Sequence, residues 1–164
     1  EAMKSVLAPD IVFTPVEPRL TKVKILTELF WGVPFLVAAT VLSLTLWRNH
    51  PWTWVFAGII LVATVWSLAL CPRRVRAMGY AELESELLIK RGIMFSKLDV
   101  IPYGRMQQVT VSSGPLLGRY GLASVTLVTA SAETDGEIPA VSTQEAERLR
   151  IKLTALGQAN LEGL

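Results

Sequence analysis

Residues 29–47, LFWGVPFLVAATVLSLTLW, form a run of 19 positions without a charged side chain. A second uncharged run, PWTWVFAGIILVATVWSLALCP, covers the 22 positions of residues 51–72. About 20 apolar residues in a helix cross the roughly 30 Å hydrocarbon core of a bilayer. Because only residues 48–50 separate the two runs, the sequence predicts two membrane spans, at about residues 29–47 and 51–71, joined as a tight hairpin.

The composition of the whole chain also favours a lipid environment. Hydrophobic residues make up 51% of the 164 positions and charged residues 18%, whereas about a quarter of an ordinary soluble domain is charged. The alternative is a compact soluble protein with an oversized core. Tryptophans favour the membrane, because all five lie in the apolar region and three gather at the hairpin turn, as interfacial aromatic residues do. They are Trp31, Trp47, Trp52, Trp54 and Trp66.

Cations flank the predicted hairpin mainly at its open end. Arg19, Lys22 and Lys24 precede the first run, and a basic cluster at the membrane edge follows the second, while the turn has only Arg48. The basic cluster consists of Arg73, Arg74 and Arg76. The positive-inside rule therefore predicts that both termini face the cytoplasm. A cleaved signal peptide is the competing interpretation, but the first run is long for one and a second span follows at once.

From residue 77 onward the pattern changes to short strands separated by turns, which is typical of a small antiparallel sandwich or barrel. The predicted strands are residues 80–84, 86–90, 94–100, 106–112, 123–129 and 137–141, with turns at residues 91–92 and 132–136. A helix should close the domain: Ser142 and Glu145 form a capping box, and Gly157 is a suitable stop. Its apolar face comprises Ala146, Leu149, Leu153 and Leu156.

The sequence therefore predicts a membrane-anchored α+β protein in four parts. They are an extended cytoplasmic segment (1–24), a two-helix hairpin (25–76), a sheet domain closed by a helix (77–157) and a tail (158–164).

No group of residues in the sequence has the pattern of a catalytic, cofactor or metal site. His50 and Cys71 are single residues of their types, so neither can belong to a cluster of its own kind. The Ser112–Ser113 pair lacks a base, and the glycines of residues 114–121 have the wrong spacing for a phosphate loop. We expect a protein that is not an enzyme and has no cofactor.

Charge also argues against two binding functions. From residue 77 onward there are eight basic and ten acidic side chains, so neither a nucleic-acid surface nor a cationic headgroup pocket is expected. The candidates for binding a partner protein are instead Arg105, Gln107, Arg119 and Tyr120. The alternative for the two arginines is that they pair with strand acids or cap loop carbonyls.

Two motifs follow the spans in order, Arg105–Val109 (RMQQV) and Gly114–Ala123 (GPLLGRYGLA). With the spans, they resemble the YdbS-like bacterial membrane proteins, which carry a bacterial pleckstrin-homology (PH) domain. The resemblance covers about residues 19–156. It implies two packed antiparallel sheets with a C-terminal helix across one end, and it makes the glycine-rich motif a connection between middle strands. It also implies the bacterial inner membrane as the location.

The function expected from the resemblance is that of an accessory or scaffold subunit in a larger membrane complex. Such proteins tend to pair with a larger membrane protein that carries several PH domains, and the family is linked to defence against membrane-active peptides. The alternative is a lipid-sensing or lipid-handling module at the cytoplasmic surface of the bilayer.

Overall fold

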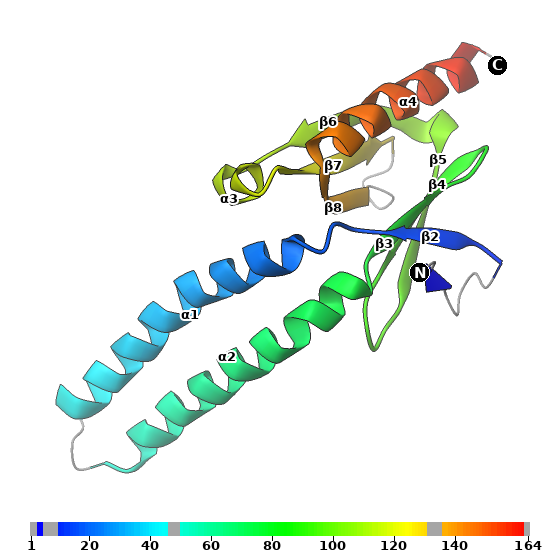
Figure 1. The fold of residues 1–164 in the computed structure, drawn as a ribbon. Coiled ribbons are helices and arrows are strands. Elements are labelled where there is room, and N and C mark those ends of the chain that lie inside the picture. The colour runs from blue at the N-terminus through cyan, green and yellow to red at the C-terminus, as the bar shows by residue number, and fades with distance from the viewer. Residues whose placement is uncertain (1–2, 5–9, 46–49, 131–135, 163–164) are drawn as a thin grey trace. The chain divides into compact units, whose positions relative to one another are not determined.

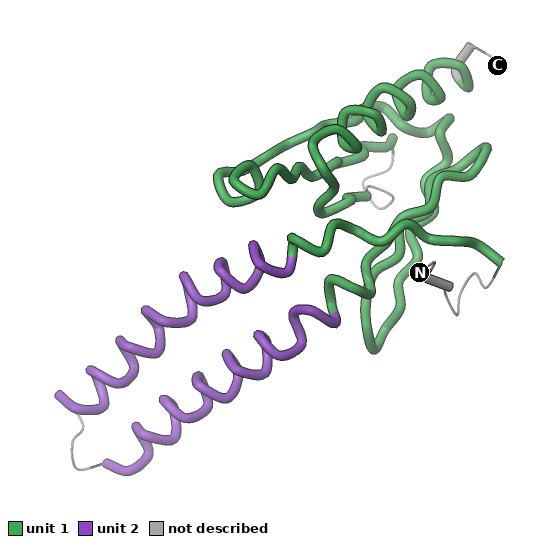
Figure 2. The backbone as a smooth tube through the Cα atoms, viewed as in Figure 1, with its two compact units in different colours: residues 1–20, 74–164 green, residues 21–73 purple. Residues whose placement is uncertain are grey.

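The structure is a computed structural model that describes residues 3–4, 10–45, 50–130 and 136–162. Its contacts divide the chain into two compact units (Figure 2). Residues 21–73 form one, which we call the membrane unit, and residues 1–20 together with 74–164 form the other, the sheet unit. The sheet unit is therefore discontinuous in sequence.

Two long helices make up the membrane unit (Figure 1). Helix α1 spans Leu20–Thr45 and α2 spans Trp52–Arg76, so each extends beyond the uncharged run that predicted it. The most apolar window of α1 is 0% buried and that of α2 is 11% buried, whereas a core helix of a soluble protein would be mostly buried. Both helices thus have the length and the exposure of membrane spans. Arg48 and Asn49 of the predicted turn lie outside the described residues.

Contacts at both ends and in the middle join the two helices of the membrane unit. Ser43 donates a hydrogen bond to the carbonyl oxygen of Thr53 at 3.2 Å near the turn. A Cβ atom placed on Gly32 would lie 3.1 Å from Cγ2 of Thr64, so the glycine allows the helices to approach closely. At the other end, the Cys71 thiol lies 3.9 Å from the carbonyl oxygen of Thr21.

The sheet unit contains two antiparallel sheets that are not hydrogen-bonded to each other within the described residues. The first, in spatial order, consists of β1 (Met3–Lys4), β2 (Val12–Pro15), β3 (Gly79–Glu82), β4 (Glu86–Arg91) and β5 (Lys97–Pro102). The second consists of β6 (Met106–Ser112), β7 (Leu122–Thr129) and β8 (Gly136–Ser142). The remaining elements are η1 (Tyr103–Arg105), α3 (Pro115–Arg119) and α4 (Thr143–Glu162). The predicted class is therefore confirmed as a two-sheet arrangement and not a closed barrel.

Strand β2 changes the predicted division of the chain. Residues 1–24 were expected to be an extended segment outside the domain, but Pro15 pairs with Gly79 of β3. Phe13 and Val16 are buried, and the Val16 amide donates to the Met78 carbonyl oxygen at 3.3 Å. The domain bounds 77–157 thus omit a strand that contributes to its core. The strand predicted at 94–100 also differs, since β5 begins at Lys97.

Helix α4 packs on the second sheet and on η1, and its predicted start is confirmed. The Ser142 hydroxyl accepts a hydrogen bond from the backbone amide of Glu145 at 3.2 Å. The apolar face of the helix is buried, and its residues Leu149 and Leu153 are both 0% exposed. Its predicted end at Gly157 is wrong, because the helix continues to Glu162. A Cβ on Gly157 would lie 3.6 Å from the Tyr103 carbonyl oxygen. This glycine therefore sits where the helix packs closely on η1.

Candidate docking surface

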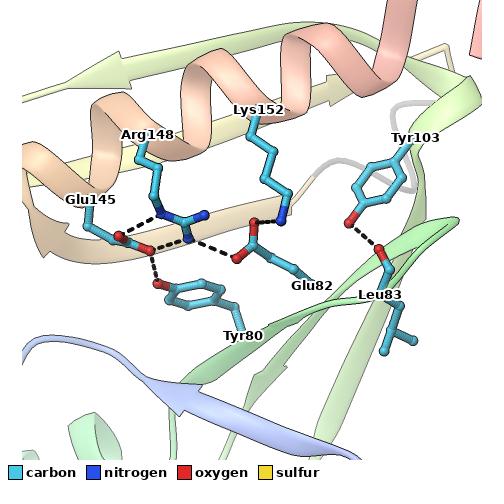
Figure 3. A network of polar contacts seen from close by, with 7 residues as sticks. All are labelled: Tyr80, Glu82, Leu83, Tyr103, Glu145, Arg148 and Lys152. Carbon is cyan, nitrogen blue, oxygen red and sulfur yellow. Dashed lines mark hydrogen bonds and ion pairs between the residues drawn. The ribbon is translucent and has the colours of Figure 1, made fainter. Parts of the chain in front are cut away.

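A network of polar side chains holds α4 against β3 of the first sheet (Figure 3). Glu82 of β3 accepts a hydrogen bond from Arg148 at 2.8 Å and lies 3.2 Å from the Lys152 ammonium. The Tyr80 hydroxyl donates to a carboxylate oxygen of Glu145 at 2.9 Å. Since these side chains come from the first sheet and from the helix that covers the second, the network joins the two layers.

The electrostatics of this network indicate a structural role. Burial raises the pKa of Tyr80, and the hydrogen bond to Glu145 raises it further, so the phenol is neutral at physiological pH. The hydrogen bond from Arg148 lowers the pKa of Glu145, which is therefore ionised. The pKa values of Tyr80 and Glu145 are both moved away from neutral pH, whereas a proton-transfer group needs a pKa near the working pH. Within the described ranges, no three His, Cys, Asp or Glu side chains could together hold a metal ion.

A groove of about 330 Å³ lies between strand β6 and the C-terminal half of α4. One wall comes from the start of β6 and the other from one face of the helix. Its lining residues are Met106, Gln107, Gln108, Val109, Arg150, Leu153, Thr154, Gly157 and Gln158. The groove thus has an apolar floor of buried Met106 and Leu153, with polar side chains above it.

Strand β6 is an edge strand with an irregular start. Among the described residues it pairs with β7 on one side only, because the second sheet has the order β6-β7-β8. The register shifts between Met106 and Gln108, which leaves Gln107 as the extra residue of a bulge, and Gln107 and Gln108 are consecutively exposed. An edge strand offers a row of backbone donors and acceptors to another chain. The groove therefore combines such an edge with amide side chains.

The four predicted partner-binding residues do not form one site. Arg105 ends η1 and Gln107 lies near the start of β6, whereas Arg119 and Tyr120 follow the other end of that strand. From Gln107 to its last residue, Ser112, β6 alone spans about 17 Å between the two pairs. Gln107 lines the groove, whereas Arg119 is exposed on α3.

The glycine-rich motif, predicted to be an irregular connection, contains the short helix α3. Pro115 begins the helix, and Gly121, with a φ of 66°, follows its end in a conformation that L side chains rarely adopt. The Tyr120 carbonyl oxygen after this helix accepts a hydrogen bond at 3.0 Å from Arg19, which also pairs with Glu17 at 2.9 Å. The motif is thus tied to the segment that leads from β2 to α1.

Sequence reasoning did not find this role of Arg19, which had been assigned only to membrane topology. The hydrogen bond joins residues 101 positions apart, and no local pattern indicates it. Arg73, Arg74 and Arg76, the predicted membrane-edge cluster, are exposed in the last turns of α2.

Comparison with known sequences assigns the fold to a family. The sequence profile described as the bacterial PH domain matches residues 20–156, which is well over half of the chain. The chain belongs to the bacterial PH domain family. The matched range of this bacterial PH domain protein includes α1 and α2 as well as the strands from β3 to β8 and most of α4.

A named relative supports the same assignment. The UPF0699 transmembrane protein YdbS of Bacillus subtilis (strain 168) is 31% identical over 130 residues, which cover 77% of this chain and 80% of the relative. No solved structure matches the chain. The resemblance to YdbS-like proteins is therefore confirmed, and this bacterial PH domain protein is a membrane protein.

Proposed function

We propose that this bacterial PH domain protein is a non-catalytic binding subunit that holds a partner protein in the groove between β6 and α4. The observation that carries the proposal is the coincidence of an edge strand with a groove beside it. An extended segment of a partner can add to an edge strand through main-chain hydrogen bonds, while pockets beside the strand select its side chains. Gln107, Gln108 and Gln158 supply neutral hydrogen-bonding groups for such a segment.

The proposed partner is a larger membrane protein that carries PH domains of its own. Two spans keep the sheet unit beside the membrane, which raises its effective concentration at a partner in the same membrane. We propose that the complex lies in the bacterial inner membrane with both termini and the sheet unit in the cytoplasm, as the flanking cations favour. A role in defence against membrane-active peptides is part of this proposal and rests on the resemblance to YdbS-like proteins.

Filling the groove tests the proposal. Thr154 is an exposed residue of α4 that lines the groove, and its neighbour Ala155 is exposed without lining it. We expect Thr154→Trp to reduce the partner that co-purifies with the full chain in a gentle detergent, while Ala155→Trp leaves it unchanged. Quantitative mass spectrometry of the purified material measures both.

Two outcomes would argue against docking in the groove. Equal recovery of the partner with Thr154→Trp and Ala155→Trp would show that the partner binds outside the groove. A monodisperse chain that purifies alone and carries one specific lipid would favour the alternative, a lipid-handling module at the bilayer surface.

A further inference from the structure

The turn between β4 and β5 exposes three large apolar side chains in succession. Met94 and Phe95 are each 87% exposed, and Ile93 is 41% exposed. Gly92, with a φ of 100°, begins this turn, and a Cβ atom there would lie 2.0 Å from the Phe95 carbonyl oxygen. Since only glycine permits that approach, the turn has a defined backbone path that presents residues 93–95 together. We call these three residues the apolar tip.

The strand register places the apolar tip at the end of the sheet from which the chain leads to both membrane helices. Gly79, the first residue of β3, pairs with Lys90, and Lys90 pairs with Leu98 just before and after the turn. Gly79 also pairs with Pro15, the last residue of β2. Figure 1 shows the β4–β5 turn at the end of the first sheet where β3 begins. The β3–β4 turn lies at the opposite end.

Chain lengths show that the apolar tip can reach the bilayer surface. From Pro72, where the uncharged run ends, α2 rises about 6 Å to Arg76, and the next three residues span at most about 10 Å to Gly79. The turn extends back beyond Lys90 by three to four residues, or about 10–13 Å. With the turn directed toward the bilayer, the distance that remains is no greater than the headgroup layer, which is about 5–8 Å thick on each side.

The positively charged side chains beside the apolar tip also favour a place at the bilayer surface. Arg91 and Lys97 flank it, and both bind the carboxylate of Asp99, Arg91 through its Nε at 3.2 Å and Lys97 at 3.1 Å. Residues 90–99 contain three cations and one acid, and of the cations Arg91 and Lys97 have exposed side chains whereas Lys90 is buried. Cations near the surface are attracted to anionic lipids, while the apolar side chains can enter the layer beneath.

We propose that the apolar tip inserts into the headgroup layer of the bilayer that α1 and α2 span. This contact gives the sheet unit a third attachment to the membrane besides its two covalent connections. It is separate from the groove between β6 and α4, which lies on the second sheet.

A fluorescent probe on the full chain tests this contact. In a Cys71→Ala background, Phe95→Cys is labelled with an environment-sensitive fluorophore, and the chain is placed in nanodiscs of phosphatidylcholine and phosphatidylglycerol. Ser85→Cys, exposed in the β3–β4 turn at the opposite end of the sheet, is the matched control. We expect blue-shifted emission at position 95, quenched by lipids that carry a nitroxide in the headgroup, and neither effect at position 85.

Two results would overturn the proposal. One is a probe at position 95 that emits as in water and resists lipid quenching, like the probe at position 85. The other is blue-shifted emission at position 95 without quenching by nitroxide lipids, because that result would place the apolar tip against protein, such as a second copy of the chain. A label at Met94→Cys repeats the measurement with Phe95 intact and should give the same quenching.

Discussion

Truncating one buried side chain of α4 should measure how strongly this helix is held in the sheet unit. Leu149 is fully buried, with Ala146 and Leu153 on the same helix face. Leu149→Ala removes three carbon atoms and leaves a cavity, and such changes in cores cost about 2–5 kcal/mol. We expect the free energy of unfolding of the sheet unit to fall by about 3 kcal/mol. Because each 1.4 kcal/mol changes an equilibrium constant tenfold, the unfolded fraction should rise more than 100-fold.

Pulse proteolysis in urea, on the full chain in detergent micelles, measures this change. With an m value of about 1–3 kcal/mol per molar urea, the midpoint should fall by about 1–3 M. Ile151→Ala is the matched control, because Ile151 is an aliphatic residue of the same helix that is 58% exposed. Arg150→Ala should also do little, since Arg150 forms an exposed pair with Glu147. Equal midpoints for Leu149→Ala and Ile151→Ala would refute the packing of α4.

Two further predictions concern pH and topology. The hydrogen bond from Arg148 lowers the folded-state pKa of Glu145 below the ordinary value of 4.5, so its stabilising contribution is complete above that value and is lost as the pH falls through the folded pKa. The difference in urea midpoint between the natural chain and Glu145→Gln should therefore shrink from neutral pH to about pH 3, and a constant difference would contradict the assignment. In a Cys71→Ala background, Asn49→Cys should react with an impermeant thiol reagent on intact cells and Thr134→Cys only after permeabilisation; the reverse pattern would invert the orientation.

Local patterns predicted the elements that depend on local physics. A membrane span needs about 20 uncharged residues, so the runs at 29–47 and 51–72 were sufficient to locate α1 and α2. The capping box at Ser142 and Glu145 likewise located the start of α4, because its hydrogen bond closes within one turn.

Elements that depend on distant contacts were missed. Strand β2 is four residues long and ends in Pro15, and its pairing with β1 and β3 defines it as a strand. Gly157 was expected to end α4, but the helix continues to Glu162, and Gly157 lies inside it in contact with η1. The candidate binding residues were separated for the same reason, because their places depend on the fold: Gln107 lines a groove, whereas Arg119 lies on α3, which follows the far end of β6.

The place of β2 in the first sheet constrains the order in which the protein can be made. About 60 residues separate Pro15 from its partner Gly79, and nearly all of them belong to the two spans. At a synthesis rate of about 5–20 residues per second, β2 waits roughly 3–12 s after leaving the ribosome before β3 exists. During that interval the hairpin emerges and can enter the bilayer. β2 can therefore pair with β3 only after the hairpin has been made, and a nascent chain whose hairpin fails to insert would bring β2 and β3 together around an apolar loop left in water.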